Sequence, residues 1–241
     1  MIVHLANARR TPNAEDGAMA SGLIVSYDGT ANDDDALALG HMLANGALRL
    51  QLAYVRHSRE YDPAREEIAA HDAERRLELG AVWLQDPDVD RHVVVDASTG
   101  VGLGRLAAEQ EPEVIVFGSE YRTTPGRVEP GRAALHLLQG GKVAVAVARA
   151  GLRLGGHGTI ETISVALSED DDAPQQTAGA LAQALGATVL AGEDPSADLI
   201  IVGSAASAPP GTVGLSGATR AKLDSARSSV LVLARETPIL Q

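Results

Sequence analysis

The stretch that decides the fold is residues 113–147, EVIVFGSEYRTTPGRVEPGRAALHLLQGGKVAVAV. It begins with an unbroken apolar run, Val114–Phe117, which is typical of a strand buried on both faces and therefore of a parallel sheet. A loop rich in glycine and proline follows, and a helix is predicted to begin near Arg132. Because free N–H groups at a helix N-terminus attract anions, the loop and the helix start form a candidate anion site.

The same pattern occurs a second time, because the residues of this stretch reappear 85 positions later without a gap. The matching pairs are Gly118 and Gly203, Ser119 and Ser204, Pro125 and Pro210, Gly126 and Gly211, Val128 and Val213, Leu138 and Leu223, Val145 and Val230, and Val147 and Val232. So many identities in one register indicate an internal duplication.

Composition and length exclude several classes of protein. A chain of 241 residues suits one large or two small domains, and the duplication favours two. An aromatic content of 2% and a net charge of -12 argue against nucleic-acid binding, which needs stacking platforms and positive charge. The absence of cysteine excludes disulfides, thiolate metal sites and a cysteine nucleophile. No apolar run approaches a membrane span and residues 1–20 lack the apolar core of a secretory signal, so we expect a cytoplasmic protein.

Strands alternate with helices along both halves of the chain, which predicts an α/β fold with parallel sheets. Strands are expected at residues 23–26, 48–55, 91–95, 114–117, 143–147, 163–167, 188–191, 199–202 and around Val230, and helices at 33–45, 63–80, 99–110, from about 132, and at 174–185. The fold class is two Rossmann-like or flavodoxin-like open sheets, with a flexible tail at 1–20, a first domain at 21–150 and a second at 151–241.

The second domain is expected to be shorter than the first. Aligning Val25 with Val165 places Ser168 at the position of Asp28. From there the second half reaches Gly203 in 35 residues, whereas the first half takes 90 residues to reach Gly118. The difference corresponds to about one helix–strand–helix block.

With these elements in place, the chain resembles the universal stress protein family, in a tandem form of the kind common in actinobacteria, over nearly all of its length after residue 20. Nucleotide-binding members of that family carry the pattern Gly-x2-Gly-x9-Gly-Ser/Thr after the fourth strand. Gly118 and Gly131 hold its first and third glycine positions, whereas Tyr121 replaces the second glycine and Arg132 the hydroxyl residue. The resemblance implies the universal stress protein fold and an adenine nucleotide, ATP or AMP, as the ligand.

The resemblance also implies which residues contact that nucleotide. Asp28 matches the acid at the end of the first strand, which faces the nucleoside, and Val55 matches the residue that flanks the base. The expected contact residues are Asp28, Val55, Gly118, Ser119, Gly126, Arg127, Val128, Gly131 and Arg132. The second half holds Ser168, Gly203, Ala206, Ser216 and Gly217 at the corresponding places, so it lacks the acid and the middle glycine, and we expect at most one nucleotide per chain.

In the resembled family the last strands of two copies pair across a two-fold axis. The apolar residues around Val145 and Val230 share one register, so the two halves are expected to pair with each other as a pseudo-dimer within one polypeptide. A homodimer of whole chains stays open beside it.

Several of these residues also have a purely structural interpretation. Asp28 lies in an Asp-Gly-Thr sequence, which is ordinary turn chemistry, and the loop glycines suit any tight connection from strand to helix. Arg132 either makes bidentate contacts to phosphate or fills the pocket with its bulk. Ser119 follows a strand as a nucleophile would, but the Gly-x-Ser-x-Gly elbow is absent. The acidic runs 33–35 and 169–172 are interpreted as charge at helix starts and not as a metal site.

Three functions compete on this basis. The first is a regulatory protein of the stress-response type that binds an adenine nucleotide and signals through protein partners of unknown identity. Its ATP hydrolysis should be slow or absent, because there is no Gly-x4-Gly-Lys-Ser/Thr loop and the only lysines are Lys142 and Lys222. The second is an interaction scaffold that has lost its nucleotide, which Tyr121 and Arg132 favour. The third, an enzyme such as an adenylate-forming one, has no visible catalytic set.

Overall fold

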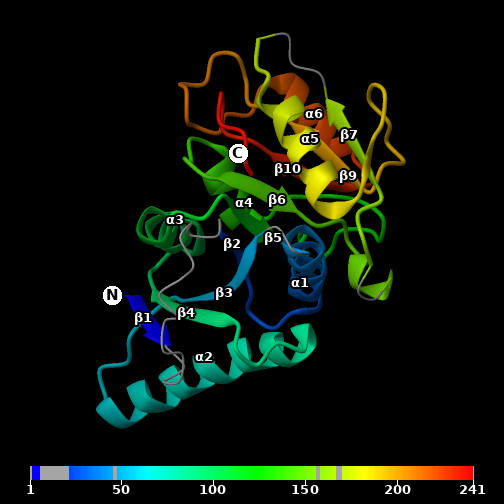
Figure 1. The fold of residues 1–241 in the computed structure, drawn as a ribbon. Helices are drawn as coiled ribbons and strands as arrows, with labels where there is room; N and C mark the ends of the chain where they lie inside the picture. The colour runs from blue at the N-terminus through cyan, green and yellow to red at the C-terminus, as the bar shows by residue number, and fades with distance from the viewer. Residues whose placement is uncertain (1, 6–21, 46–47, 156–157, 167–169, 241) are drawn as a thin grey trace, which may run out of the picture.

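The protein is an α/β molecule built on one continuous, mostly parallel sheet (Figure 1). Its structure is a computed structural model that describes residues 2–5, 22–45, 48–155, 158–166 and 170–240. The strands are β1 (Ile2–Leu5), β2 (Gly22–Ser26), β3 (Arg49–Arg56), β4 (Asp90–Val95), β5 (Val114–Phe117), β6 (Ala144–Val147), β7 (Thr162–Ala166), β8 (Thr188–Val189), β9 (Leu199–Val202) and β10 (Ser229–Val232). The helices are α1 (Ala31–Ala44), α2 (Pro63–Leu84), α3 (Thr99–Gln110), α4 (Arg132–Leu138), α5 (Ala173–Leu185) and α6 (Gly217–Ser225), with a 3-10 turn, η1 (Leu152–Gly155).

The order of strands across the sheet is β1-β4-β3-β2-β5-β6-β10-β9-β7-β8. We call residues up to 150 the first half and the later residues the second half. Strands β2 to β6 of the first half run parallel to one another, as do β7 to β10 of the second half. The parallel α/β arrangement predicted from the sequence is therefore confirmed in both halves.

The two halves meet at an antiparallel pair, β6 with β10, in the middle of the sheet. Val230 lies opposite Val147, and Val232 opposite Val145. This confirms the predicted pairing of the two last strands, which joins the two halves in one sheet. Both strands are buried along their full length, so each half covers the edge that the other would expose.

The second half is shortened where the sequence predicts it. Residues 190–198, all of them described, connect β8 to β9 without a helix or strand, whereas α2, β4 and α3 lie between β3 and β5 in the first half. The second half therefore lacks a helix–strand–helix block and its side of the sheet is narrower.

The start of the chain departs from the prediction of an unstructured tail over residues 1–20. Ile2–Leu5 form β1, which pairs antiparallel with β4 at the edge of the sheet. The run Ile-Val-His-Leu is too short to show a period, and only the open edge of β4 gives its backbone groups partners. Residues 6–21 lie outside the described part of the chain.

Two hydrophobic clusters cover the two faces of the sheet. On one face α1, α2 and α5 pack on the sheet, and on the other face α3, α4 and α6 do so. Alternate residues of β5 enter the two clusters, Val114 and Val116 on one face and Ile115 and Phe117 on the other. Each cluster contains residues of both halves, so the core is continuous across the β6–β10 pair. Among the described helices, none has the length and apolarity to cross a membrane.

Candidate functional site

A cavity of about 330 Å³ opens at the carboxyl ends of β2, β3 and β5. Strands β2 and β5 are neighbours, but the chain leaves β2 for α1 on one face and leaves β5 for α4 on the other. This is the switch point at which open parallel sheets bind their ligands. The lining residues are Ser26, Tyr27, Asp28, Asp33, Tyr54, Val55, His57, Arg76, Thr99, Phe117, Gly118 and residues 131–134.

The cavity brings together part of the set expected from the sequence. Asp28, Val55, Gly118, Gly131 and Arg132 all line it, although they come from three strand ends and a helix start. Arg132 is the first residue of α4, where its amide and that of the next residue have no acceptor within the helix.

The remaining expected residues of the loop lie away from the cavity wall. The buried Ser119 hydroxyl donates to the carbonyl of Ala148 at 2.6 Å and accepts from the amide of Glu129 at 3.2 Å. Because its hydroxyl both donates and accepts inside the protein, Ser119 ties the loop to the segment that follows β6.

Gly126, Arg127 and Val128 also hold the loop in place. Gly126 has a φ of +80° and donates its amide to the carbonyl of Ala150 at 2.8 Å. The guanidinium of Arg127 donates to the carbonyl of Ser225 in the second half at 3.3 Å. Val128 is buried in the hydrophobic cluster of α3, α4 and α6. These three residues shape the loop without reaching the cavity.

Several amides of the loop already have partners in the protein. The backbone amide of Glu120 donates to the carbonyl of Glu129 at 2.8 Å, and the backbone amide of Arg127 donates to the carbonyl of Thr124 at 3.1 Å. At the start of the loop, a Cβ atom on Gly118 would overlap the backbone oxygen of Asn32, so only glycine fits there. The loop is a tightly bonded connection, and only its two ends face the cavity.

The second half repeats this loop bond for bond. The Ser204 hydroxyl donates to the carbonyl of Leu233 at 2.6 Å and accepts from the amide of Gly214 at 3.0 Å. Gly211 has a φ of +73° and donates its amide to the carbonyl of Arg235 at 2.8 Å. The duplicated serine and glycine residues therefore stabilise the shape of the loop in both halves.

The ligand positions of the second half differ from those of the first. Ser168 lies outside the described residues. Ser216 caps α6 by accepting the amide of Thr219 at 3.0 Å, and Gly217 is the first residue of that helix.

Two carboxyl groups face each other at the mouth of the cavity. The amide of the exposed Asp28 donates to Asp33 Oδ2 at 2.7 Å, and Asp28 Oδ1 accepts the amide of Thr30 at 3.0 Å. Burial, the hydrogen bond to Asp28 and the charge of Asp28 together raise the pKa of Asp33 to about 8. Burial acts in the same direction on Asp28, but hydrogen bonds with Asp33 and Thr30 outweigh it and lower the pKa of Asp28. The pair therefore holds one negative charge near neutral pH and can both donate and accept hydrogen bonds.

Sequence patterns did not identify Asp33 as a cavity residue, because acidic residues are common in the first turn of any helix. They also missed Arg76, which reaches the cavity from the long charged helix α2. Its guanidinium donates to the backbone carbonyl of Asp28 at 2.7 Å and lies 5.5 Å from the ring centre of Tyr54. Arg76 and Arg132 give the cavity positive charge beside the acid pair.

The other acidic residues of the helix starts also differ from the prediction of solvated charge. Asp35 and Asp171 are both buried and accept backbone amides, Asp35 from Gly151 at 2.8 Å and Asp171 from Glu236 at 3.1 Å. Among the described residues, no group of three or more histidine, aspartate or glutamate side chains is placed to hold a metal ion.

Comparison with solved structures identifies the fold. No protein-family model matches the sequence, and no curated protein matches it. The structure is similar to that of a universal stress protein from Archaeoglobus fulgidus DSM 4304, with a TM-score of 0.57 and 16% identity, covering 90% of this chain and 100% of that one. It is also similar to a protein of unknown function from Pseudomonas aeruginosa PAO1, with a TM-score of 0.57 and 15% identity, covering 91% of this chain and 94% of that one. The chain thus has the universal stress protein fold, as the sequence resemblance implies.

Proposed function

We propose that this protein is a regulator of the universal stress type that binds an adenine nucleotide, ATP or AMP, in the cavity of the first half. It consists of two such units, at residues 21–150 and 151–241, acts in the cytoplasm, and passes the ligand state on through contacts with partner proteins. The observation that carries the proposal is the cavity at the β2–β5 switch point, where Asp28 and Asp33 meet the start of α4. Ligands of doubly wound α/β proteins bind at this place in the fold.

The cavity offers complementary groups for each part of a nucleotide. Val55 and Phe117 provide apolar walls for a base, and the Asp28–Asp33 pair can accept hydrogen bonds from ribose hydroxyls. The free amides at the start of α4 and the guanidinium of Arg132 can receive a phosphate. At about 330 Å³ the cavity is at the small end of ligand sites, which suits one mononucleotide.

Regulation fits the site better than catalysis does. Phosphoryl transfer needs a residue that positions the nucleophile and cations that hold the γ-phosphate. Lys222 pairs with Glu193 in the second half, and Lys142 lies outside the cavity lining. Arg76 and Arg132 supply the cavity with cations, but neither lysine of the chain lines it, so we expect any hydrolysis of a bound ATP to be slow.

A second candidate is an interaction scaffold that binds no nucleotide. It is favoured by the loop amides of Glu120, Gly126 and Arg127, which donate to carbonyls of the protein and leave only the ends of the loop for phosphate. Tyr121, at the position of the second motif glycine, is exposed.

Mass spectrometry of protein purified without added nucleotide, followed by titration calorimetry with ATP and with AMP, separates the two candidates. We expect one site per chain. Asp28→Ala should weaken binding by roughly ten- to a hundred-fold, because a charged hydrogen-bond acceptor contributes about 1.5–3 kcal/mol. Arg132→Ala should also weaken it, whereas Arg220→Ala, an exposed arginine on α6, should not. Protein that neither carries nor binds a nucleotide would be the scaffold, and two equivalent sites would show that the second half binds as well.

A further inference from the structure

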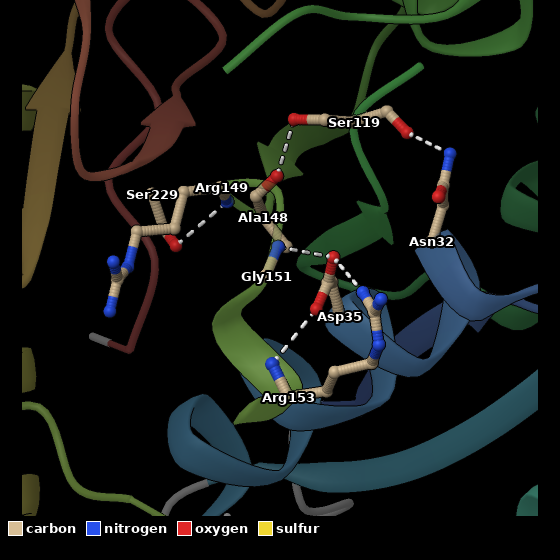
Figure 2. Close-up of polar contacts among 8 residues, drawn as sticks. All are labelled: Asn32, Asp35, Ser119, Ala148, Arg149, Gly151, Arg153 and Ser229. Atoms are coloured by element: carbon tan, nitrogen blue, oxygen red, sulfur yellow. Dashed lines mark hydrogen bonds and ion pairs between the residues drawn. The ribbon is translucent and has the colours of Figure 1, made fainter. Parts of the chain in front are cut away.

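Residues 148–153, which we call the linker, leave β6 and lead toward the second half. The linker contacts three parts of the molecule, namely α1, β10 and the loop of residues 118–131, which we call the glycine loop (Figure 2). The residues that make these contacts do not line the cavity. The glycine loop and α1 each have other residues that do line it, whereas β10 pairs with β6 between the halves.

The first set of contacts joins the linker to the glycine loop. Ala148 accepts the Ser119 hydroxyl at 2.6 Å. Ala150 accepts the amide of Gly126 at 2.8 Å and donates its own amide to the carbonyl of Arg127 at 2.8 Å. The shape of the loop between Gly118 and Gly131, the two ends that face the cavity, therefore depends on where the linker lies.

The second set joins the linker to α1 through one buried carboxylate. Asp35, only 1% exposed, accepts the amides of Gly151 and Arg153 and a guanidinium N–H of Arg153, each at 2.8 Å. A buried carboxylate without such partners would be strongly destabilising, so helix and linker are held together. Figure 2 shows the Asp35 side chain on α1 pointing at Gly151 and Arg153.

Helix α1 connects this carboxylate back to the cavity. Asp33, two residues before Asp35, lines the cavity and accepts the amide of Asp28. On the same helix the Asn32 side chain donates to the carbonyl of Ser119 at 2.9 Å. The loop, the linker and α1 thus form a closed ring of hydrogen bonds beside the cavity.

The third set joins the ring to the second half. The amide of Arg149 donates to the Ser229 hydroxyl at 3.2 Å, and Ser229 is the first residue of β10. The loop itself reaches the second half where Arg127 donates to the carbonyl of Ser225. Any shift of the linker therefore acts on both the cavity and the pairing of β6 with β10.

We propose that the linker couples the cavity to the contact between the halves, with Asp35 as the positioning residue, so that a filled cavity and a firmly paired β6–β10 stabilise each other. The inference rests on the proposed function, and it names the hydrogen bonds through which nucleotide binding would affect the pairing of the two halves. Coupling of this kind is reciprocal: if the pairing strengthens binding, binding strengthens the pairing by the same factor.

The second half contains a matched control. Asp171 is buried, accepts the amide of Ala173 at 2.9 Å, and accepts the amide of Glu236 at 3.1 Å. Glu236 follows β10 as Gly151 follows β6, and both have positive φ, +58° and +83°. Asp171 therefore binds the segment after β10 as Asp35 binds the linker after β6, but neither Asp171 nor Glu236 lines the cavity.

The first measurement needs no ligand. Amide hydrogen exchange is compared among the parent protein, Asp35→Asn and Asp171→Asn. We expect Asp35→Asn to speed exchange of the Gly126 and Glu129 amides about tenfold or more, and Asp171→Asn to leave both within about twofold of the parent. Arg153→Ala, which keeps the carboxylate, serves as a milder second variant should Asp35→Asn fail to fold. Equal loop exchange in the parent and the variants of Asp35 and Arg153 would overturn the proposal.

The second measurement adds ATP to the same proteins. Affinity should fall at least about fivefold in Asp35→Asn or Arg153→Ala and stay within about twofold in Asp171→Asn, and ATP should slow exchange of the β6 and β10 amides in the parent. A parent protein that binds neither ATP nor AMP would refute the proposed function, while the ligand-free comparison would still decide the coupling. Normal affinity in both Asp35→Asn and Arg153→Ala, or unchanged β6–β10 exchange on binding, would refute the coupling itself.

Discussion

At the scale of single residues, the Asp28–Asp33 pair is the most sensitive feature of the site. Asp33 is half-buried and lies against Asp28, so its carboxyl keeps a proton in the folded protein that it loses in the unfolded chain. A folded-state pKa above the ordinary value stabilises the folded state at low pH, and this contribution is lost as the pH rises toward the folded pKa. For Asp33 the window runs from its ordinary value of 3.8 to about 8. Asp28, with its lowered pKa, acts in the opposite direction and only below its ordinary value.

This predicts the behaviour of Asp33→Asn. The asparagine still offers an oxygen to the amide of Asp28 but cannot ionise, so the loss of stability between about pH 5 and pH 8 should become smaller than in the parent. Urea unfolding of both proteins at several pH values within this window measures the two slopes. Parallel curves would mean that Asp33 keeps an ordinary pKa and that the cavity mouth holds two charges.

At the scale of elements, the glycine loop is a repeated structural unit. Its two copies share the serine hydroxyl bonds, the glycine with positive φ and the amide bond to the residue three positions after the last strand. The first copy ends at a cavity that Gly118 and Gly131 line. The structural and ligand-binding contributions of the loop can therefore be separated by making the same change in both copies.

Ser119→Ala and Ser204→Ala form such a pair. Each change leaves a buried carbonyl without its donor and an amide without its acceptor, so each should lower the free energy of unfolding by about 1–3 kcal/mol. Urea denaturation measures this loss, and calorimetry with ATP then distinguishes the two, because only Ser119→Ala should also weaken binding. A similar loss of affinity from Ser204→Ala would contradict the assignment of the site to the first half.

The elements that the sequence predicts well are those whose signal is local. The apolar runs at 114–117 and 199–202 match β5 and β9 residue for residue, because strands buried on both faces have no polar alternation to blur their ends. The shared register of Val145 and Val230 predicted the β6–β10 pair. Side chains alternate between the two faces of a strand, so the apolar pattern fixes which residues share a face.

The sequence is least informative about contacts between distant residues. Ser119 was expected at the nucleotide, but its partner Ala148 lies 29 positions away and leaves no local pattern. Arg76 reaches the cavity from the middle of α2, where a charged residue is indistinguishable from an ordinary solvated one. The glycine spacing of the sequence correctly indicates that Gly118 and Gly131 lie at the cavity. The positions of the residues between them depend on hydrogen bonds to distant parts of the chain.

At the scale of the whole molecule, the two halves share one core. The cluster on the face of α1, α2 and α5 contains Leu23 and Leu52 of the first half together with Ile163 and Leu231 of the second. No boundary in the hydrophobic packing separates the halves, so the protein should unfold as one cooperative unit.

Leu231→Ala tests this cooperativity. Leu231 is 0% exposed in β10, so its truncation should cost about 2–5 kcal/mol. The single tryptophan, Trp83, lies on α2 in the first half and reports unfolding there through its fluorescence, while circular dichroism reports on the whole chain. Both signals should shift to lower urea by the same amount. If the fluorescence midpoint stayed in place while circular dichroism split into two steps, the halves would be independent domains.

The β6–β10 pair has a further consequence because both strands belong to one polypeptide. Two separate subunits meet only as often as their concentration allows, whereas tethered partners meet at a fixed effective concentration, of millimolar order when the connection is short and flexible. Dilution therefore does not separate the halves, and each polypeptide contains one copy of both. Under that condition the second half needs only to keep β10 against β6. It can lack a helix–strand–helix block, and hold Ser168 where the first half has an acid, without exposing the edge of the first half.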